Sequence, residues 1–236
     1  MPGCPQCAQP LRTLRPTAHY GREVEIELCT ACRLVWFDPG ESMRIDAPGW
    51  IGLLRQLADR EAAAHPWHGQ PLACPHCRQA LLPQHDRTRY GRFIVQACPV
   101  GHGSVQNLAA LLARRGLVRA PTPAERAAMQ AAPQAWACLN CGAPWPPGAA
   151  ECGHCATPAL LVDLVRLADS LRPQAASRDT VSDGRPTTWA CHACGRPLDP
   201  TRQATCPHCS HPVMAPAMAD LEPLLAALAA AWQGPG

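Results

Sequence analysis

Cysteine pairs at a two-residue spacing are the part of this sequence whose residue type and spacing could do chemistry. Fourteen of the 15 cysteines form seven Cys-x-x-Cys pairs, and Cys98 alone has no such partner. When two such pairs come together, four thiolates bind a tetrahedral metal ion, usually Zn²⁺. A thioredoxin-like redox pair is the competing interpretation, but it requires a βαβ context and normally uses one motif. The seven pairs therefore predict zinc sites.

The order of the pairs along the chain divides them into four ligand sets. In the first two sets the second half follows the first after 21 and 20 residues, and in the last two sets after 10 and 11. Since each set offers four protein ligands and no open position, we expect four structural Zn²⁺ ions per chain. The predicted ligands are Cys4, Cys7, Cys29 and Cys32; Cys74, Cys77, Cys98 and His102; Cys138, Cys141, Cys152 and Cys155; and Cys191, Cys194, Cys206 and Cys209.

We expect His102 to replace the missing cysteine of the second set. Alignment of the second unit on the first places Gly101 near the position of Cys32, and glycine has no side chain to bind a metal. His102 is the next residue, and imidazole is a standard fourth zinc ligand. His76 is the rival, but it lies inside its own Cys-x-x-Cys loop, where its ring would point away from the metal. The remaining histidines have no spaced partner or lie inside a complete set, so we expect no metal-binding role for them.

Two kinds of repeated unit must position these ligands. Tyr-Gly-Arg occurs at 20–22 and 90–92, each time followed by an alternating strand and a cysteine, and predicts a hairpin turn at Tyr-Gly. Trp-Ala-Cys-x-x-Cys-Gly-x-Pro occurs at 136–144 and 189–197. Internal repeats of this kind indicate two duplications placed end to end.

An apolar helical stretch follows each unit. The expected helix starts are Pro48, a Ser104 cap, a Thr157 cap with Pro158 as the first helical residue, and Asp220, with a further short helix capped by Thr122. We expect these helices to cover the ribbons or to pack on one another, because an apolar stripe usually faces a core. The last helix, at 220–232, is almost uniformly apolar and is the candidate surface for a protein partner.

Together these elements predict a small metal-bound α+β protein with four zinc ribbons, each a pair of β-hairpin knuckles followed by an amphipathic helix. Segments rich in Pro, Ala, Ser and charge, without an apolar period, are expected to be linkers. The expected units are ribbon 1 with long arms (1–66), ribbon 2 with long arms and a Cys3His site (67–120), a linker (121–135), short ribbon 3 (136–171), a linker (172–188), and short ribbon 4 with the C-terminal apolar helix (189–236).

The charge of the chain is uneven. All 21 basic residues are arginine, which excludes chemistry that needs a lysine, such as a P-loop or a Schiff base. The formal charge of +3 becomes about −4 when 15 thiolates and four Zn²⁺ are counted. Residues 70–120 nevertheless carry a formal charge of +6. Any contact with nucleic-acid phosphates is therefore expected at Arg78, Arg87, Arg89, Arg92, Arg114, Arg115 and Arg119.

The first unit, CPQCAQPLRTLRPTAHYGREVEIELCTACRLVWFDPGE, resembles a bacterial zinc ribbon of the transcription factor IIB type. In such ribbons the second knuckle is followed by a Trp, an acidic residue and Gly-Glu, which are Trp36, Asp38, Gly40 and Glu41 here. The second unit, with CPVGHGSVQNLAALLARRGLVR, resembles a variant that lacks one cysteine and this acidic tail. The short units resemble paired rubredoxin-like ribbons. These resemblances imply ribbon folds and bound zinc over most of the chain, and they leave the function open.

The sequence therefore predicts a non-enzymatic zinc-binding adaptor or scaffold that binds protein partners through its ribbons and apolar helices. The alternative is a nucleic-acid-binding or transcription-associated protein that uses the basic second ribbon. An enzyme is not expected, because the zinc sites are closed and no acid–base or nucleophile constellation is present. With no signal-peptide pattern and no run of 18 apolar residues, we expect a cytoplasmic protein without a membrane partner.

Overall fold

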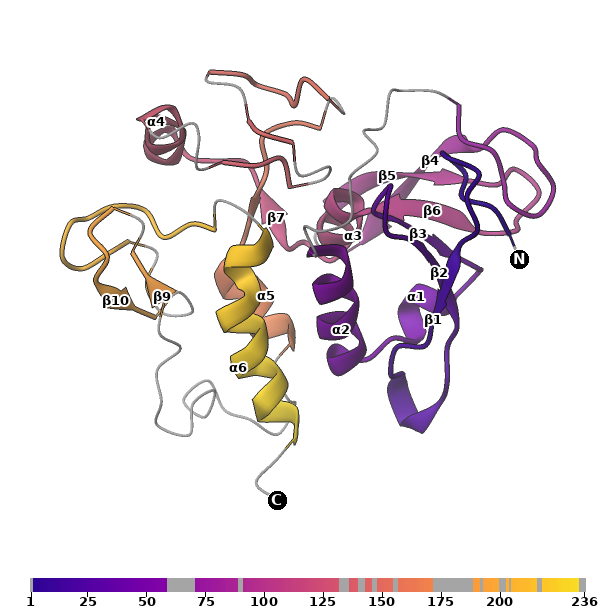
Figure 1. Ribbon diagram of the computed structural model, residues 1–236, viewed down its shortest axis with the longest axis horizontal. Helices are drawn as coiled ribbons and strands as arrows, with labels where there is room; N and C mark the ends of the chain where they lie inside the picture. Colours follow the sequence, from indigo (N-terminus) through magenta and orange to yellow (C-terminus); the bar gives the residue numbers. More distant parts are fainter. Residues whose placement is uncertain are drawn as a thin grey trace.

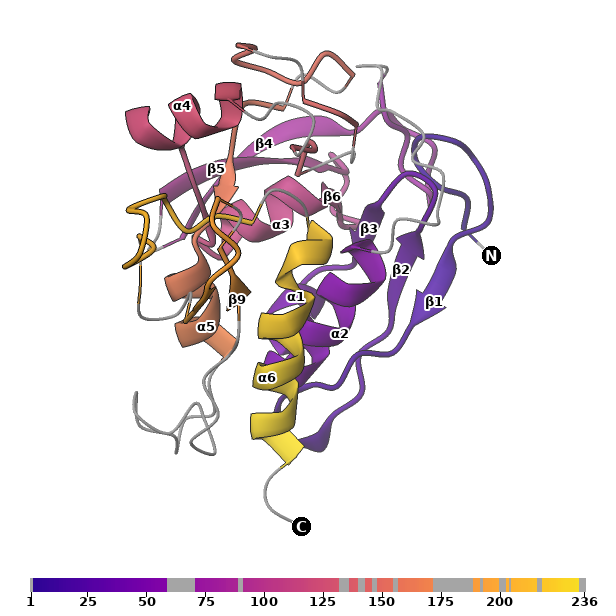
Figure 2. The same cartoon turned by 60° about the vertical axis from the view of Figure 1, so that its left-hand side comes forward.

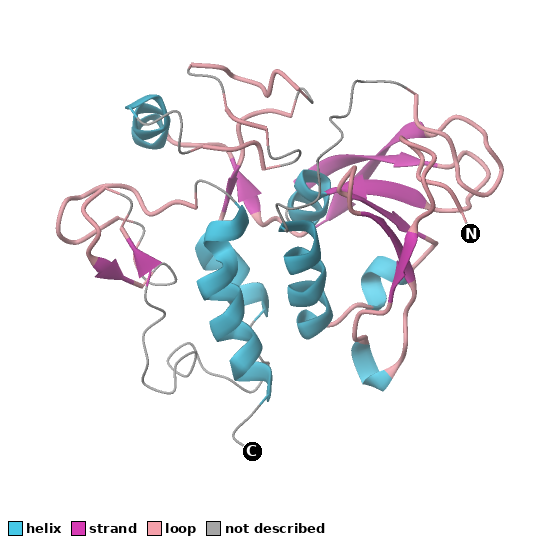
Figure 3. Ribbon diagram, viewed as in Figure 1, coloured by secondary structure: helices cyan, strands magenta, loops and turns pink. Residues whose placement is uncertain are grey.

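An antiparallel sheet and a group of helices are the main regular elements of the computed structural model (Figure 1). The structure describes residues 2–58, 71–88, 91–131, 136–139, 143–145, 148–154, 157–171, 189–191, 193–199, 203, 205–215 and 218–233. The sheet lies on one side of the molecule, and helices gather beside it (Figure 3). The expected α+β class is confirmed at this level, with a mostly antiparallel sheet.

Strands from the first two units form one six-stranded sheet. The strands are β1 (Arg12–Leu14), β2 (Ile26–Cys29), β3 (Leu34–Phe37), β4 (Leu82–Thr88), β5 (Gly91–Ala97) and β6 (Ser104–Asn107), in the spatial order β1-β2-β3-β6-β5-β4. At the centre β3 pairs with β6, so that Leu34 lies opposite Asn107 and Phe37 opposite Ser104. The two halves of the sheet are thus joined edge to edge by equivalent strands.

The alternation predicted around β2 is confirmed. Ile26 and Leu28 are buried whereas Glu25 between Val24 and Ile26 is exposed. The predicted turn at Tyr20 is also present, because Tyr20 and Gly21 both have a φ of 63° between β1 and β2. In the second unit Thr88 pairs with Gly91, and the two residues that join them, at 89 and 90, lie outside the described part of the chain.

Two short two-stranded sheets lie in the second half of the chain. One pairs β7 (Val118–Arg119) with β8 (Leu161–Val162), and the other pairs β9 (Trp189–Ala190) with β10 (Pro197–Leu198). The helices are α1 (Glu41–Arg44), α2 (Ala47–Ala58), α3 (Leu108–Arg114), α4 (Pro123–Ala131), α5 (Leu164–Leu171) and α6 (Glu222–Gln233), with 3-10 turns at His19–Gly21 and Met218–Leu221.

Two helix starts agree with the sequence. Helix α2 begins at Ala47, one residue before the expected Pro48, and Asp46 caps it by accepting a hydrogen bond from the Gly49 N–H at 2.9 Å. Helix α4 lies inside the segment expected to be a linker, as the Thr122 cap predicted. Thr122 and Glu125 form a reciprocal capping box there.

Two predicted helix starts are wrong, and both for the same reason. Helix α3 begins after Asn107, whose side chain accepts from the Ala110 N–H at 2.8 Å, because Ser104–Asn107 are used as β6. Helix α5 begins at Leu164 and not at Thr157–Pro158, because Leu161 and Val162 pair with β7. In each case pairing with a distant strand delays the helix by several residues.

The main core lies between the sheet and the helices. Val35 and Phe37 on one face of β3 join apolar residues of α2, α3, α5 and α6 in a single buried cluster. Helix α6 packs against α2 and α5, and Figures 1 and 2 show it beside α2. Its residues Leu224, Leu225 and Leu228 are buried. The apolar stripe of the C-terminal helix therefore packs against other helices of the same chain.

Candidate metal centres

Six cysteine knuckles share one backbone structure. The N–H of the first cysteine donates to the carbonyl five residues later in every case, for example Cys4 to Gln9 at 2.7 Å and Cys206 to His211 at 2.8 Å. The residue before the first cysteine forms a β-bridge or ladder pair with the residue six positions after that cysteine. This small loop holds the chain so that two side chains can point to one side. The six knuckles begin at Cys4, Cys74, Cys138, Cys152, Cys191 and Cys206.

A proline stands at the sixth position in five of these knuckles, and the sequence analysis did not use this signal. The five residues are Pro10, Pro144, Pro158, Pro197 and Pro212, and Ala80 takes the place in the second set. The next backbone hydrogen bond is made by the residue after this position. In the first knuckle the Leu11 N–H donates to the Pro2 carbonyl at 3.0 Å. The sixth residue therefore needs no N–H, and proline is tolerated there. Cys-x-x-Cys-x-x-Pro is thus the better sequence pattern for this knuckle.

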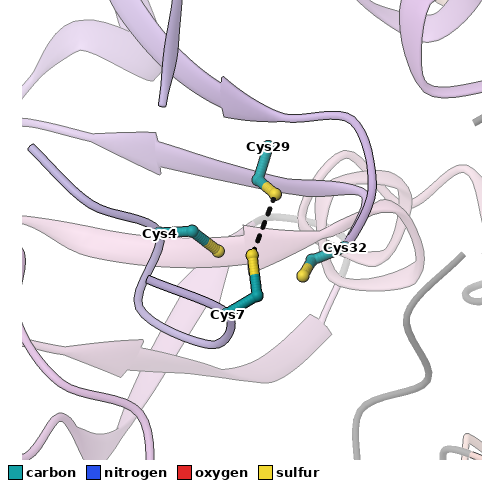
Figure 4. Close-up of side chains that lie close together, drawn as sticks. All are labelled: Cys4, Cys7, Cys29 and Cys32. Carbon is teal, nitrogen blue, oxygen red and sulfur yellow. Dashed lines mark hydrogen bonds between the residues drawn. The ribbon is translucent and has the colours of Figure 1, made fainter. Parts of the chain in front are cut away.

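The first ligand set is assembled at one end of the sheet. Cys4 and Cys7 come from the first knuckle, and Cys29 and Cys32 come from the turn that joins β2 to β3. All four sulfurs lie within 4.8 Å of one another, and Figure 4 shows the side chains turned toward a common centre. The Sγ atoms of Cys7 and Cys29 are 3.8 Å apart.

The second set is assembled in the same way, and it includes His102. Cys74, Cys77, Cys98 and His102 have their ligand atoms within 4.8 Å of one another. His102 Nδ1 is 3.7 Å from Cys74 Sγ and 3.6 Å from Cys98 Sγ. Cys98 and His102 lie in the turn between β5 and β6, where Gly101 has a φ of 85° and Gly103 a φ of 134°. These positive φ values are ones that glycine adopts without steric cost.

The fourth set is complete and more exposed. Cys191, Cys194, Cys206 and Cys209 have their sulfurs within 4.8 Å, and two pairs of sulfurs are 3.7 Å apart. Cys194 and Cys209 are exposed, whereas Cys191 and Cys206 are buried.

Only half of the third ligand set lies within the described residues. Cys138 and Cys152 are buried in one cluster with Trp136 and Trp145, and each begins a knuckle of the shared type. Cys141 and Cys155 lie outside the described residues.

The spacing of the donor atoms fits tetrahedral zinc. Sulfurs at about 2.3 Å from one ion lie ~3.8 Å from one another, and a sulfur and an imidazole nitrogen lie ~3.6 Å apart. The observed separations of 3.6 to 3.8 Å match these values, whereas a disulfide would bring two sulfurs to about 2.05 Å. All cysteines among the described residues are free. The groups are therefore consistent with structural zinc.

Without a metal, close contact between the thiols gives them different pKa values. Hydrogen bonds from Cys32 and Cys4 lower the pKa of Cys29 to about 4, and hydrogen bonds with Cys29 and Cys4 raise the pKa of Cys32. One sulfur thus holds a negative charge that its neighbours stabilise by donating protons. A metal ion that displaces those protons would satisfy all four sulfurs together.

His76, the rival ligand, points elsewhere. Its Nε2 lies 3.6 Å from Asp38 Oδ1, and its ring lies beside those of Trp36 and His102, with centroids 5.7 Å away in each case. It therefore links the tail of the first ribbon to the second metal centre. We expect His102→Ala to lose one of the bound zinc ions and His76→Ala to keep them all, as measured by native mass spectrometry. Equal zinc content in the two variants would contradict this assignment.

The acidic tail of the first unit forms a local structure of its own. Trp36 Nε1 donates to Asp38 Oδ1 at 2.8 Å, and the Asp38 N–H donates to Glu41 Oε2 at 2.8 Å. Gly40 has a φ of 84°, which the turn into α1 requires. Burial raises the pKa of Glu41 to about 7. This tail orders the exit from β3 and the entry to α1.

The exposure of the fourth set gives it a distinct expected behaviour. Because Cys194 and Cys209 are exposed, a chelator can reach a metal there with little rearrangement. In the first set Cys4 and Cys29 are buried in a cluster with Trp36. We expect the fourth site to release zinc first when the loaded chain is titrated with a chelating dye. Cys194→Ser should remove this fast phase; retention of the fast phase would contradict the prediction.

The arginines proposed to contact phosphate have different surroundings in the structure. Arg115 stacks on the Trp50 ring at 4.0 Å and donates to the Ser42 carbonyl. Arg119 pairs with Glu125, at 2.5 and 2.7 Å, and Glu125 is buried. Arg115 and Arg119 thus make contacts within the chain. Arg87 and Arg92 lie directly opposite each other on β4 and β5, and residue 89 lies outside the described part of the chain.

Comparison with known proteins identifies no relative: no family model matches the chain, and neither a curated protein nor a solved structure shows significant similarity to it. Within the described residues, no helix has both the length and the apolar character needed to cross a bilayer.

Proposed function

We propose that the chain is a non-enzymatic zinc-binding adaptor in which four Zn²⁺ ions have a structural role. The observation that carries this proposal is the composition of the three assembled ligand sets. Each supplies four protein donors around one centre, so a bound zinc ion would have no open position for substrate or water. Cysteines and a histidine also form the donor set that zinc prefers over magnesium or calcium.

Zinc would cross-link the buried cluster that lies between the first two ligand sets. The cluster between the first two sets contains Cys4, Cys29, Cys74 and Cys98, and its other members include Leu34, Trp36 and Val105. Unliganded thiols crowded at this centre must share protons, whereas coordinated thiolates are satisfied. The residues of the chain thus bind and orient the ion, and the ion holds two distant segments of each ribbon together.

One cavity among the described residues lies apart from the proposed metal ligands. It has a volume of about 460 Å³ and is lined by residues such as Trp50, Leu54, Leu111 and Trp232. None of its described lining residues belongs to a proposed metal site. A second cavity, of about 230 Å³, does include a proposed ligand, Cys98, in its lining.

The partner surface of such an adaptor can be tested by substitutions on the exposed side of the last helix. Leu224, Leu225 and Leu228 of α6 lie in the core, so removing α6 would damage the fold. The exposed side of α6 carries Ala226 and Ala230. If a partner binds this side, Ala226→Arg with Ala230→Arg should abolish its co-purification without loss of zinc. An unchanged partner set would exclude this face of the helix.

A further inference from the structure

The cavity of about 460 Å³ lies where several helices meet the first hairpin. Its described lining comes from α2, from the last residues of α3, α5 and α6, and from the turn between β1 and β2. Small-molecule sites in proteins have volumes of about 300–1,000 Å³. The cavity is therefore large enough to hold a small ligand.

One wall of this cavity is apolar. Leu54 of α2, Leu111 of α3 and Leu117 line it, and each is at most 5% exposed. Ala47 and Ser170 also line the cavity, and such small side chains leave space that larger ones would fill. An apolar group of a ligand placed against the leucine wall would lose its contact with water, and this favours binding.

Two side chains of opposite charge line the same cavity. Asp46 precedes α2, and its Oδ1 accepts hydrogen bonds from the Thr17 hydroxyl and from the first turn of the helix. Arg115 follows α3 and donates to the Ser42 carbonyl at 3.1 Å. Contacts within the chain thus fix both charged groups before a ligand binds, and such preorganisation lowers the entropic cost of binding.

Both charged groups lie beside Trp50, which is another residue of the lining. The Trp50 N–H donates to the Asp46 carbonyl at 3.0 Å, so Asp46 is one helical turn away. The guanidinium carbon of Arg115 lies 4.0 Å from the centroid of the Trp50 ring. A single small ligand can therefore reach both charges.

The turn at Tyr20 forms the mouth of the cavity. Tyr20 belongs to the lining and is nevertheless 96% exposed, so the cavity opens to solvent on this side. Its φ of 63° is uncommon for a residue other than glycine. Backbone strain of this kind is frequent at binding sites. A ligand can enter past this turn without separation of the helices.

We propose that this cavity binds a free amino acid with a large apolar side chain, with the carboxylate toward Arg115 and the ammonium group toward Asp46. This binding goes beyond the adaptor function and does not depend on it. A simple carboxylic acid would be repelled by Asp46, and a simple amine by Arg115. A zwitterion makes a favourable charge-assisted contact with each of them, while its apolar side chain lies against the leucine wall.

The test compares three probes that share one aromatic ring. Isothermal titration calorimetry measures their binding to the zinc-loaded full-length chain. The probes are L-phenylalanine, 3-phenylpropionate, which lacks the ammonium group, and 2-phenylethylamine, which lacks the carboxylate. We expect phenylalanine to bind with a Kd below about 1 mM, and about tenfold more tightly than either analogue. A weaker Kd, or an analogue that binds as tightly as phenylalanine, overturns the proposal.

Two variants assign the charges to their groups. Asp46→Asn keeps an oxygen for the helix cap, because Asn caps helices as well as Asp does. It should weaken phenylalanine binding about tenfold and leave 3-phenylpropionate unchanged or more tightly bound. Arg115→Gln should weaken phenylalanine binding by a similar factor and leave 2-phenylethylamine unchanged or more tightly bound. If either variant weakens phenylalanine and its paired analogue equally, the charged contact does not exist and the proposal fails.

A matched pair of substitutions on α5 tests the place of binding. Ser170→Phe puts a large side chain into the lining and should abolish binding of phenylalanine. Val165→Phe adds a ring on the same helix at a position that is 40% exposed and is not among the described lining residues, and it should leave binding unchanged. Equal affinities in these two variants would overturn the proposal. Circular dichroism and zinc content check the fold of every variant, and the three-probe comparison in the unaltered chain decides the proposal without any of them.

Discussion

Removal of zinc from the loaded chain is expected to unfold the N-terminal sheet. Structural zinc contributes roughly 10–16 kcal/mol per site at neutral pH in small domains, about as much as the whole stability of a typical protein. Here the ligands themselves form part of the buried cluster that includes Leu34, Trp36 and Val105. Loss of the ions therefore removes the cross-links and exposes part of a core. Far-ultraviolet circular dichroism and tryptophan fluorescence, recorded during titration with a strong chelator, would measure the change.

The control for this experiment is re-addition of metals. Zn²⁺ should restore both signals, and Mg²⁺ should not, because thiolates and imidazole bind magnesium poorly. Reducing agent keeps the cysteines free, so that oxidation does not mimic metal loss. A chain that keeps its native spectra after complete chelation would contradict the structural role of zinc.

Gly103→Ala is expected to cause the second large effect, a loss of stability on the order of 4 kcal/mol or more together with loss of the second zinc ion. Gly103 has a φ of 134°, a conformation that alanine adopts only with strain. A Cβ there would also collide with the carbonyl oxygen of Phe37 at the end of β3. Relief of this collision must move either the β3–β6 junction or the neighbouring His102. Denaturant unfolding and zinc analysis of the same variant would measure both consequences.

Gly101→Ala is the matched control for Gly103→Ala. Gly101 also has a positive φ, 85°, but a Cβ there meets no atom within 4 Å. Gly101→Ala should lower the free energy of unfolding only by the backbone strain, about 1–2 kcal/mol, and the second zinc ion should remain. Similar losses in the two variants would mean that contact between the two ribbons contributes little.

The grouping of side chains in three of the four expected sets could be predicted from the sequence, because a knuckle is a local structure. Its hydrogen bonds join residues five positions apart, so short spacings contain the needed information. The position of His102 beside Cys74, Cys77 and Cys98 could also be predicted, since it lies four residues from Cys98 and its flanking glycines allow the bend. Alternation in β2 and the Thr122 cap were equally local signals.

The arrangement of the units could not be predicted, because it depends on pairing between distant segments. Ser104–Asn107 has the composition of a helix start, yet it is a strand because β3 offers a partner 70 residues away. The same applies to Leu161–Val162, which pair with β7. The buried position of Leu224 and Leu225 also depends on distant partners, since α2 and α5 cover one side of α6.

X-ray absorption at the zinc edge, combined with metal analysis of the same loaded full-length sample, tests the central proposal most directly. The account predicts four zinc ions per chain with a dominant sulfur shell near 2.3 Å. Fifteen sulfurs and one imidazole nitrogen should be shared among the four ions. Fewer than three ions per chain, or a first shell dominated by oxygen, would contradict it.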